Sequence, residues 1–246
     1  MFKNLSQYSN VLHLITQKNP SEPYNFSLAL HTKENPLKIL KNRNILRKQF
    51  PNMQFIVANQ THSANIKIIQ NSPTLGWESL DNAIENCDAL ISNQTKIMLT
   101  ILTADCVPIL LFDPINKVIG AVHAGWKGTQ QEILFKTVKK MEEVFQSNPR
   151  NIVAGIAPSI GKCCYEVDWN VAQHFHAIND AYEEKEGNKY MLDLPHINKI
   201  QLLKAGLNEE NIEHSKVCTA CEVNKYFSYR KEQGCSGRFM SMIGLN

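Results

Sequence analysis

The chain has 246 residues, of which 43% are hydrophobic and 20% are charged. These proportions are typical of a globular protein and exclude a disordered, fibrous or membrane-embedded chain. The formal net charge is +3, from 26 basic and 23 acidic side chains, with no block of basic residues. The composition therefore argues against a protein that binds the backbone of a nucleic acid, whereas small anions stay candidate ligands.

The first part of the chain, residues 1–16, contains no uninterrupted apolar stretch and no small-residue cleavage site, so we predict no signal peptide. The most apolar stretch, residues 97–112, is interrupted by threonine, aspartate and proline and is too polar for a membrane-spanning helix. The seven cysteines are irregularly spaced, which favours a reducing compartment over a disulfide framework. We therefore expect a cytoplasmic protein without a membrane partner. Nothing in the sequence marks an interface, so we expect a monomer.

Apolar periodicity predicts the secondary structure in chain order. Short strands are expected at residues 53–58 and 66–70, and three apolar runs at 97–102, 107–112 and 118–123 should form one buried sheet. Thr129 and Glu132 have the spacing of a capping box, which predicts a helix from there to about Gln146.

The second half of the chain contains fewer apolar runs. It predicts a strand at 152–156, a helix at about 168–178, a solvated loop at 179–190 and a helix over 195–205 that ends at Gly206. Strands and helices mix without regular βαβ alternation. The expected fold is therefore α/β with mixed sheets (α+β), in one domain that spans residues 1–246, rather than a doubly wound nucleotide-binding fold.

A cysteine and a histidine lie beside two of the predicted strands. The segment Asp113-Pro-Ile-Asn116 has the residue preferences of a tight turn, so residues 107–112 and 118–123 are predicted to form a hairpin. If Asp113 pairs with Asn116, Cys106 lies opposite His123, with Cβ atoms about 5 Å apart. The two side chains could then share a metal ion or a proton, although a longer connection would shift this register by one or two residues.

Zinc suits such a pair, because it binds cysteine thiolate and histidine nitrogen. A catalytic zinc site has three protein ligands and an open fourth position. His62 is the best candidate for the third ligand, since it lies in a polar loop between two strand-like segments. The separations of 44 residues from His62 to Cys106 and of 17 from Cys106 to His123 match no local zinc-finger spacing.

Other cysteines also lie close together in sequence. The adjacent Cys163 and Cys164, with the motif Cys218-Thr-Ala-Cys221, could form a second metal site. A single CxxC motif without a matching partner is a weak signal, so these residues are not included in the candidate site.

Six motifs are distributed over nearly the whole chain. They are Gln60-Thr-His-Ser63, Cys87-Asp-Ala-Leu90, Thr103-Ala-Asp-Cys-Val-Pro108, Ala121-Val-His-Ala-Gly-Trp-Lys-Gly128, Ala157-Pro-Ser-Ile-Gly-Lys-Cys-Cys-Tyr-Glu166, and Phe227-Ser-Tyr-Arg230 with Gly237-Arg238. Together and in this order they resemble the YfiH/YlmD-type laccase-domain family. The combination is far more specific than any one of the motifs.

The resemblance implies a single mixed α/β domain and a zinc site of two histidines and one cysteine, which correspond to His62, Cys106 and His123. It also implies phosphorolysis of adenosine, inosine and S-methyl-5'-thioadenosine, and hydrolytic deamination of adenosine. The partners would be purine nucleosides and inorganic phosphate. The chain departs from the family pattern in residues 16–21 and 27–30. It also has Lys127 where arginine is commoner, which keeps the charge but loses the bidentate fork.

Further site residues follow from the two reactions. For deamination, the metal would lower the pKa of a bound water molecule that attacks the purine carbon carrying the amino group. Asp105 could orient the reactants or relay a proton. For phosphorolysis, phosphate would attack the ribose carbon as the base leaves. Lys127 and Arg238 would bind the anion, and the helix predicted after Thr129 would present free backbone N–H groups beside Lys127.

Three alternatives use the same residues. In a cysteine hydrolase, Cys106 would be a thiolate nucleophile activated by His123, and the reaction would be amide hydrolysis, such as editing of a peptidoglycan precursor. A copper-dependent polyphenol oxidase would need a multinuclear cluster rich in histidine pairs, and only His174-Phe-His176 has that spacing, so copper would be adventitious. A structural zinc site on a non-enzymatic binding module would normally have a fourth protein ligand.

Overall fold

Apolar runs form the centres of two β-sheets in the computed structural model, which describes residues 2–70, 73–234 and 236–246. In spatial order, the strands of the larger sheet are β12 (Ile212–His214), β8 (Val153–Ile156), β6 (Val107–Asp113), β7 (Val118–Ala124), β4 (Ala89–Ser92) and β3 (Ile66–Ile68). Those of the second sheet are β1 (Val11–Ile15), β13 (Phe239–Leu245), β5 (Ile97–Thr103) and β2 (Gln54–Val57). Both sheets contain parallel and antiparallel pairs, which confirms the mixed α/β fold.

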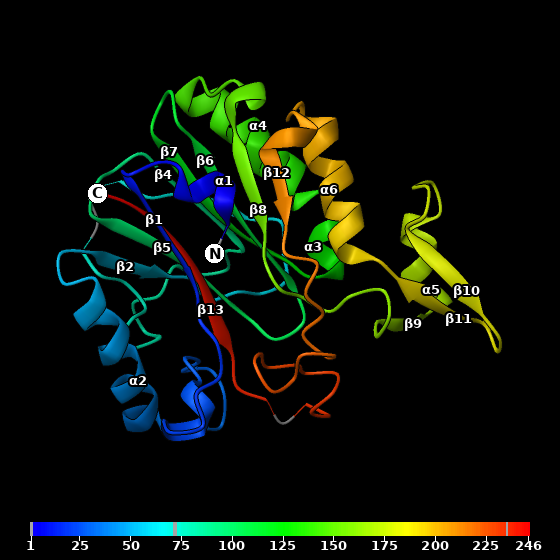
Figure 1. The fold of residues 1–246 in the computed structure, drawn as a ribbon, viewed down its shortest axis with the longest axis horizontal. Helices are drawn as coiled ribbons and strands as arrows, with labels where there is room; N and C mark the ends of the chain where they lie inside the picture. The colour runs from blue at the N-terminus through cyan, green and yellow to red at the C-terminus, as the bar shows by residue number, and fades with distance from the viewer. Residues whose placement is uncertain (1, 71–72, 235) are drawn as a thin grey trace.

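The two sheets pack face to face and are covered by helices on their outer faces (Figure 1). Alternate residues of β5 and β6, including Leu99 and Leu110, form the core between the sheets. The longer helices are α2 (Pro36–Gln49), α4 (Ile133–Phe145) and α6 (Leu194–Ala205). Helix α2 packs through Leu46 on the four-stranded sheet, whereas α4 and α6 cover the six-stranded sheet. The central strands are therefore apolar on both faces, which explains their uninterrupted hydrophobic runs.

The short helices are α1 (Lys3–Ser6), α3 (Trp126–Gln130) and α5 (Trp169–Ala172), with 3₁₀ turns η1 (Pro23–Phe26), η2 (Pro149–Asn151), η3 (Gln173–Phe175) and η4 (Glu209–Asn211). Among the described residues, no helix is both long enough and apolar enough to cross a membrane.

The prediction of one buried sheet for the three central runs is wrong. Strand β5 belongs to the four-stranded sheet, whereas β6 and β7 belong to the six-stranded sheet. The chain changes sheets between β5 and β6, where Asp105 has a φ of +88°, outside the range that strands adopt. The sequence pattern could not show this step, because both sheets bury their strands equally.

The predicted register of the hairpin is also wrong, by two residues. Strands β6 and β7 do form an antiparallel hairpin, but Asp113 pairs with Val118 and His123 lies opposite Pro108 rather than Cys106. The Asp113 carboxylate accepts hydrogen bonds from the backbone N–H groups of Ile115 and Asn116, which closes a longer connection than a two-residue turn.

The helix predicted to start at Thr129 is two helices, α3 and α4. The capping box does not form, because Thr129 lies inside α3 and its hydroxyl and carbonyl oxygens accept hydrogen bonds from Asn198 and Gln201 of α6. Glu132, between the two helices, is left-handed, with a φ of +58°. Contacts with α6 thus override a local capping signal. The predicted helix over 195–205 is confirmed and ends at Gly206, whose φ is +105°.

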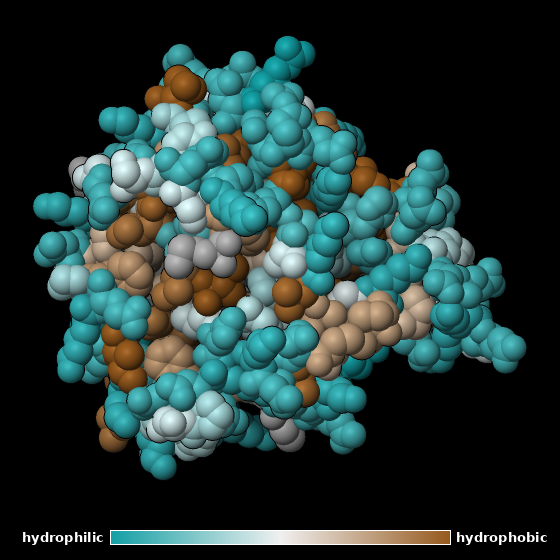
Figure 2. Space-filling model, in the orientation of Figure 1, coloured by the Kyte–Doolittle hydropathy of each residue, from teal (hydrophilic) through white to brown (hydrophobic). Residues whose placement is uncertain are grey.

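The polar segment 179–190 is part of a small sheet rather than a solvated loop. Strands β10 (Tyr182–Lys185), β11 (Lys189–Leu192) and β9 (Glu166–Asp168) form an antiparallel three-stranded sheet that projects from the molecule (Figure 1). The rings of Tyr182 and Tyr190 pack edge to face with centroids 5.3 Å apart. Figure 2 shows a mostly hydrophilic surface at the tip of this projection. The predicted helix over 168–178 is only α5 followed by η3.

Candidate metal centre and cavity

Three side chains from distant parts of the chain converge between the two sheets. His62 lies in the loop after β2, Cys106 lies immediately before β6, and His123 is in β7. The two imidazole groups and the thiol each offer a ligand atom, and these atoms all lie within 4.8 Å of one another. The structure therefore brings the predicted His62, Cys106 and His123 together, although Cys106 and His123 are not directly opposed on the hairpin.

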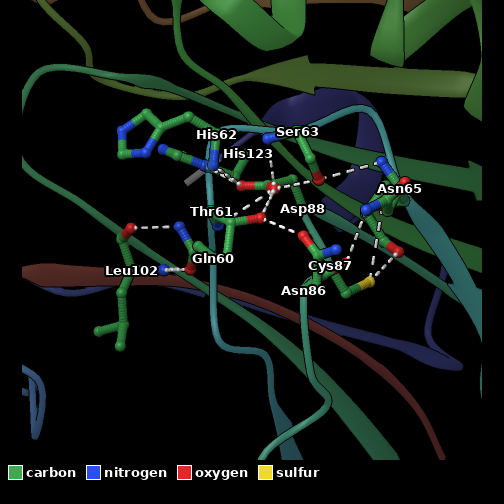
Figure 3. Close-up of polar contacts among 11 residues, drawn as sticks. Gln60, Thr61, His62, Ser63, Asn65, Asn86, Cys87, Asp88, Leu102 and His123 are labelled. Carbon is green, nitrogen blue, oxygen red and sulfur yellow. Dashed lines mark hydrogen bonds and ion pairs between the residues drawn. The ribbon is translucent and has the colours of Figure 1, made fainter.

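The buried carboxylate of Asp88 holds the two histidines of this group in place (Figure 3). Its Oδ1 accepts a hydrogen bond of 2.7 Å from Nδ1 of His123 and one of 3.1 Å from the backbone N–H of His62. Its Oδ2 accepts bonds of 2.7 Å from both the backbone N–H and the hydroxyl of Ser63. Because His123 donates from Nδ1, its Nε2 is left as the nitrogen that can bind a metal.

Two backbone features bring His62 and Cys106 close together. His62 has a φ of +60°, in the left-handed region that is uncommon outside glycine. A Cβ atom on Gly125, which precedes α3, would lie 2.9 Å from Cδ2 of His62 and 3.1 Å from Sγ of Cys106. Glycine at this position therefore leaves the room that the side chains of His62 and Cys106 occupy.

Charge couples Cys106 to His123 in the metal-free protein. Burial by itself would raise the pKa of Cys106, but the positive charge of His123 and hydrogen bonds from His123 and His62 outweigh it and lower the pKa to about 6. Burial would likewise lower the pKa of His123, but the Cys106 thiolate and Asp88 raise it to about 9. The hydrogen bonds from His123 and Ser63 hold the pKa of Asp88 well below its usual range despite its burial. The thiolate form that a metal requires is thus already present at neutral pH.

This ion pair predicts the pH dependence of thiol reactivity. In metal-free protein, alkylation of Cys106 by iodoacetamide should be half-maximal near pH 6, because the thiolate exists above its pKa of about 6. An ordinary cysteine reaches half-maximum near pH 8.5. Site-resolved mass spectrometry against pH would measure this, with zinc-loaded protein as the protected control. A midpoint for Cys106 near that of an ordinary cysteine would contradict the ion pair.

A cavity of about 570 Å³ opens above the side chains of His62, Cys106 and His123. Aromatic side chains of Trp126, Tyr165 and Tyr229 line it, together with the guanidinium groups of Arg230 and Arg238. The cavity thus combines apolar surfaces for a flat ring with positive charge for an anion, beside a group that can bind a metal. Its size is within the usual range for a small-molecule site.

The remaining predicted site residues lie at different distances from this cavity. Asp105 lines it, but its carboxylate accepts a bond of 2.6 Å from the Thr219 hydroxyl and one of 2.7 Å from the Arg230 backbone N–H. Arg238 lines the cavity, and its side-chain hydrogen bonds to described residues all leave from Nη1. Lys127 is exposed on α3, with its ammonium group 5.6 Å from the Trp126 ring centre, and is not among the residues lining the cavity.

The observed helix boundaries change which backbone N–H groups lie beside Lys127. Helix α3 begins at Trp126 and α4 begins at Ile133, so the backbone N–H groups beside Lys127 belong to the first turn of α3 rather than to a helix that starts after Thr129. Residues 127–130 already lie within α3.

Sequence reasoning assigned no role to several residues of the site. Asp88, Tyr229 and Arg230 all lie within the motifs Cys87-Asp-Ala-Leu90 and Phe227-Ser-Tyr-Arg230, so the motifs were a signal for them. His31 also lines the cavity. No sequence feature distinguished His31, because it lies in a loop whose position depends on packing against the C-terminal part of the chain.

Comparison with solved structures supports this fold. The structure superposes on YlmD from Geobacillus stearothermophilus with a TM-score of 0.94 and 28% identity, covering 100% of this chain and 94% of that one. It also matches a protein described as hypothetical protein YfiH from Bacillus licheniformis, with a TM-score of 0.90 and 31% identity over 96% and 93% of the two chains.

Curated relatives match over most of the chain. One is "Purine nucleoside phosphorylase YlmD" of Bacillus subtilis, 34% identical over 238 residues, which are 94% of this chain and 84% of that protein. Another is "Purine nucleoside phosphorylase" of Bacteroides thetaiotaomicron, 29% identical over 100% of this chain and 95% of that protein. The family model described as "Multi-copper polyphenol oxidoreductase laccase" matches residues 15–246. The chain therefore belongs to this laccase-domain family, together with the YlmD and YfiH proteins.

Proposed function

We propose that the protein is a metal-dependent purine nucleoside phosphorylase. The observation that carries the proposal is the convergence of His62, Cys106 and His123 at a cavity that also contains aromatic rings and arginines. Two of the relatives described above are named purine nucleoside phosphorylases, one of which spans all of this chain. Phosphorolysis requires a site for a planar base and a site for phosphate, and the cavity has residues for both.

We propose zinc as the metal. Two imidazole groups and one thiolate form a donor set that zinc prefers, and the three atoms within 4.8 Å of one another fit ligands around one ion. Among the described residues, no fourth histidine, cysteine or carboxylate joins this group, so a coordination position would be left for substrate or water. Zinc would supply a Lewis acid that stabilises negative charge in the cavity.

The other cavity residues have roles in binding and positioning. Trp126, Tyr165 and Tyr229 provide ring faces on which a purine can stack. Arg238 has Nε and Nη2 groups beyond its bonds from Nη1, so it can bind two oxygens of phosphate. A phosphate oxygen would form a bond to C1' of the ribose as the bond from C1' to the purine nitrogen breaks, and the leaving base would take up a proton.

For Asp105 the geometry favours a positioning role. Its carboxylate joins the segment before β6 to Thr219 and to the backbone of Arg230. It would thereby hold the arginine wall of the cavity against the metal ligands. This use of both carboxylate oxygens competes with the proton relay expected from the sequence.

The direct test of the function is product analysis. Zinc-loaded protein incubated with adenosine or inosine and phosphate should release adenine or hypoxanthine with ribose 1-phosphate, and omission of phosphate should stop base release. Formation of inosine from adenosine would show that the same site also deaminates, which we propose as a second activity. Neither product from any purine nucleoside would contradict the proposal.

The phosphate site yields a prediction that compares two basic residues. Arg238→Ala should raise the KM for phosphate by about tenfold or more, because a charge-assisted hydrogen bond contributes about 1.5–3 kcal/mol. Lys127→Ala should have a smaller effect, since Lys127 lies outside the cavity lining. Steady-state kinetics at varied phosphate would measure both. A larger KM effect for Lys127→Ala would instead place the anion at α3.

The ion pair of Cys106 and His123 favours one alternative, the cysteine hydrolase. In that reaction the Cys106 thiolate would attack an amide carbonyl, and neither His62 nor a metal would be needed. His62→Ala with chelation distinguishes the two functions, because a zinc enzyme would lose activity under both treatments whereas a thiol hydrolase would keep most of it. His196→Ala is a control, as this half-buried histidine bonds the carbonyl of Asn179 and does not line the cavity.

A further inference from the structure

Four cysteines form a second cluster outside the cavity. Cys163 and Cys164 lie in the loop after β8, and Cys218 and Cys221 lie in the segment after β12. Their four sulfur atoms all lie within 4.8 Å of one another. The Sγ atom of Cys221 is 3.6 Å from that of Cys163 and 3.5 Å from that of Cys164. All four are free thiols in the structure.

The backbone brings the two pairs together independently of any bond between sulfurs. Ser159 and Cys218 form a parallel bridge, with Thr219 N–H donating to the carbonyl of Ser159 at 3.0 Å. The backbone N–H of Gly161 donates to Sγ of Cys218 at 3.2 Å. A Cβ atom on Gly161 would lie 3.3 Å from Cβ of Cys218 and 3.4 Å from Sγ of Cys163, so the two cysteines pack closely against this glycine.

Each pair of cysteines is presented by a turn. Cys164 and Tyr165 donate their N–H groups to the carbonyl of Gly161, and Glu222 donates to the carbonyl of Cys218. The second turn contains the CxxC motif. It therefore has in space the matching partner that it lacked in the sequence, because the adjacent pair Cys163 and Cys164 lies against it.

We propose that these four cysteines bind one zinc ion as a structural tetrathiolate site. With zinc–sulfur bonds of about 2.3 Å, a tetrahedron has sulfur–sulfur edges of about 3.8 Å, close to the distances of 3.5 and 3.6 Å around Cys221. Four thiolates select zinc or iron, and the compact spacing suits one ion rather than a multinuclear cluster. The N–H group of Gly161 supplies the hydrogen bond to a ligand sulfur that such sites commonly contain.

A single disulfide fits this arrangement less well. Cys221 lies at nearly the same distance from Cys163 and from Cys164, so no unique pair is selected. The surface beside the cluster contains Lys216 and Lys231, whose charges would offset the negative charge of a zinc tetrathiolate, whereas Lys225 is paired with Glu222 at 2.9 Å. A single metal ion bound by all four sulfurs would instead take ligands from both turns.

The site would stabilise one wall of the cavity. Tyr165 directly follows Cys164, and Thr219, which directly follows Cys218, donates its hydroxyl hydrogen to Asp105. Arg230 contacts the segment of Tyr165, with its Nη1 donating to the carbonyl of Glu166 and its guanidinium 5.3 Å from the Tyr165 ring centre. With four protein ligands the ion has no open position, so its role is structural.

Metal content distinguishes this site from the His62–Cys106–His123 centre. Protein purified under reducing conditions without a metal-affinity tag should contain two zinc ions per chain by mass spectrometry. Cys106→Ala should retain one, held by the four cysteines. The double variant Cys163→Ser/Cys218→Ser should also retain one, held at the other centre, so each variant controls for the other.

Cobalt gives a second test that does not depend on serine variants folding. Metal-free Cys106→Ala protein titrated with Co²⁺ should develop thiolate-to-cobalt charge-transfer absorption that saturates at one equivalent, and zinc should abolish it. A Cys106→Ala chain that holds no zinc and gives no such absorption would overturn the proposal. So would one equivalent of iron in place of zinc, or an intact mass lower by two hydrogens that reveals a disulfide. Failure of nucleoside phosphorolysis would leave these readouts unchanged.

Discussion

Replacing Cys106 with alanine is expected to remove the metal from the His62–Cys106–His123 centre and to lower kcat/KM for phosphorolysis by about 10³-fold. Metal Lewis-acid stabilisation contributes several kcal/mol, and about 4 kcal/mol corresponds to this factor. The thiolate of Cys106 is the only anionic ligand of the three, so its loss leaves two neutral imidazoles as ligands. Zinc analysis and steady-state kinetics on the same preparation would measure both effects.

Three companion variants make this prediction specific. His62→Ala should also lose metal and activity, whereas His196→Ala should lose neither. Cys106→Ser tests the thiolate itself, because serine keeps the size but is not ionised at neutral pH. Full activity in Cys106→Ala would contradict a catalytic role for Cys106 in either mechanism. Loss of activity with the metal of this centre retained would instead support direct nucleophilic catalysis by Cys106.

Replacing Asp88 with alanine is expected to have the largest combined effect on stability and metal affinity. Its carboxylate is fully buried and accepts hydrogen bonds from His123, from the His62 backbone and from Ser63. Removing one partner of a buried charged pair costs about 3 kcal/mol or more. Loss of such an outer hydrogen bond to a ligand lowers metal affinity by about 10- to 100-fold. Denaturant unfolding and competitive zinc titration would measure the two effects.

Asp88→Asn separates charge from shape. Asparagine keeps one oxygen acceptor but places an NH₂ group beside the two Ser63 donors that bond Oδ2. The Asp88→Asn protein should therefore bind zinc more weakly than the unchanged protein and remain less stable than it. Asp81→Ala is the matched control, because Asp81 is exposed and its contact with Ser79 is local. If Asp88→Ala lowered stability and zinc affinity as little as Asp81→Ala does, Asp88 would not be the residue that positions His62 and His123.

The acidity of Asp88 also sets the direction of the pH effect on stability. Its pKa is lowered in the folded protein, so its contribution to stability is present above the unfolded value near 3.9 and is lost as the pH falls through the folded pKa. Asp88 should therefore stay ionised in mild acid and keep its hydrogen bonds. The side chains of His62, Cys106 and His123 would still release a bound metal when they become protonated. As the pH falls, release of the metal should therefore precede the loss of stability that protonation of Asp88 causes.

Local sequence predicted those elements whose signal does not depend on their neighbours. The runs at β5, β6 and β7 are apolar on both faces, and the helix that ends at Gly206 has a residue free to adopt a φ of +105°. By contrast, the capping signal at Thr129 failed because α6, which lies far along the chain, binds the same oxygens. The hairpin of β10 and β11 was not predicted, because its paired Tyr182 and Tyr190 lie in a segment of mostly charged residues that shows no apolar periodicity.

The site shows the same division. The residue types of His62, Cys106 and His123 and their family motifs pointed to these three as candidate metal ligands, since chemistry restricts which side chains can bind zinc. Sequence could not show that Asp88 joins two of them, because it is 35 residues from His123 along the chain. Nor could it show that Arg230 and Asp105, 125 residues apart, share a hydrogen bond.

The sequence by itself thus determined the buried strands, the class of fold and the candidate metal ligands, because apolar patterning and donor chemistry are properties of short segments. Only the tertiary structure decided which sheet each strand joins, which register the β6–β7 hairpin adopts, and which side chains line the cavity. It also brought Cys163 and Cys164 to the CxxC turn. These features depend on packing and hydrogen bonds between distant segments, whose energies no local pattern contains.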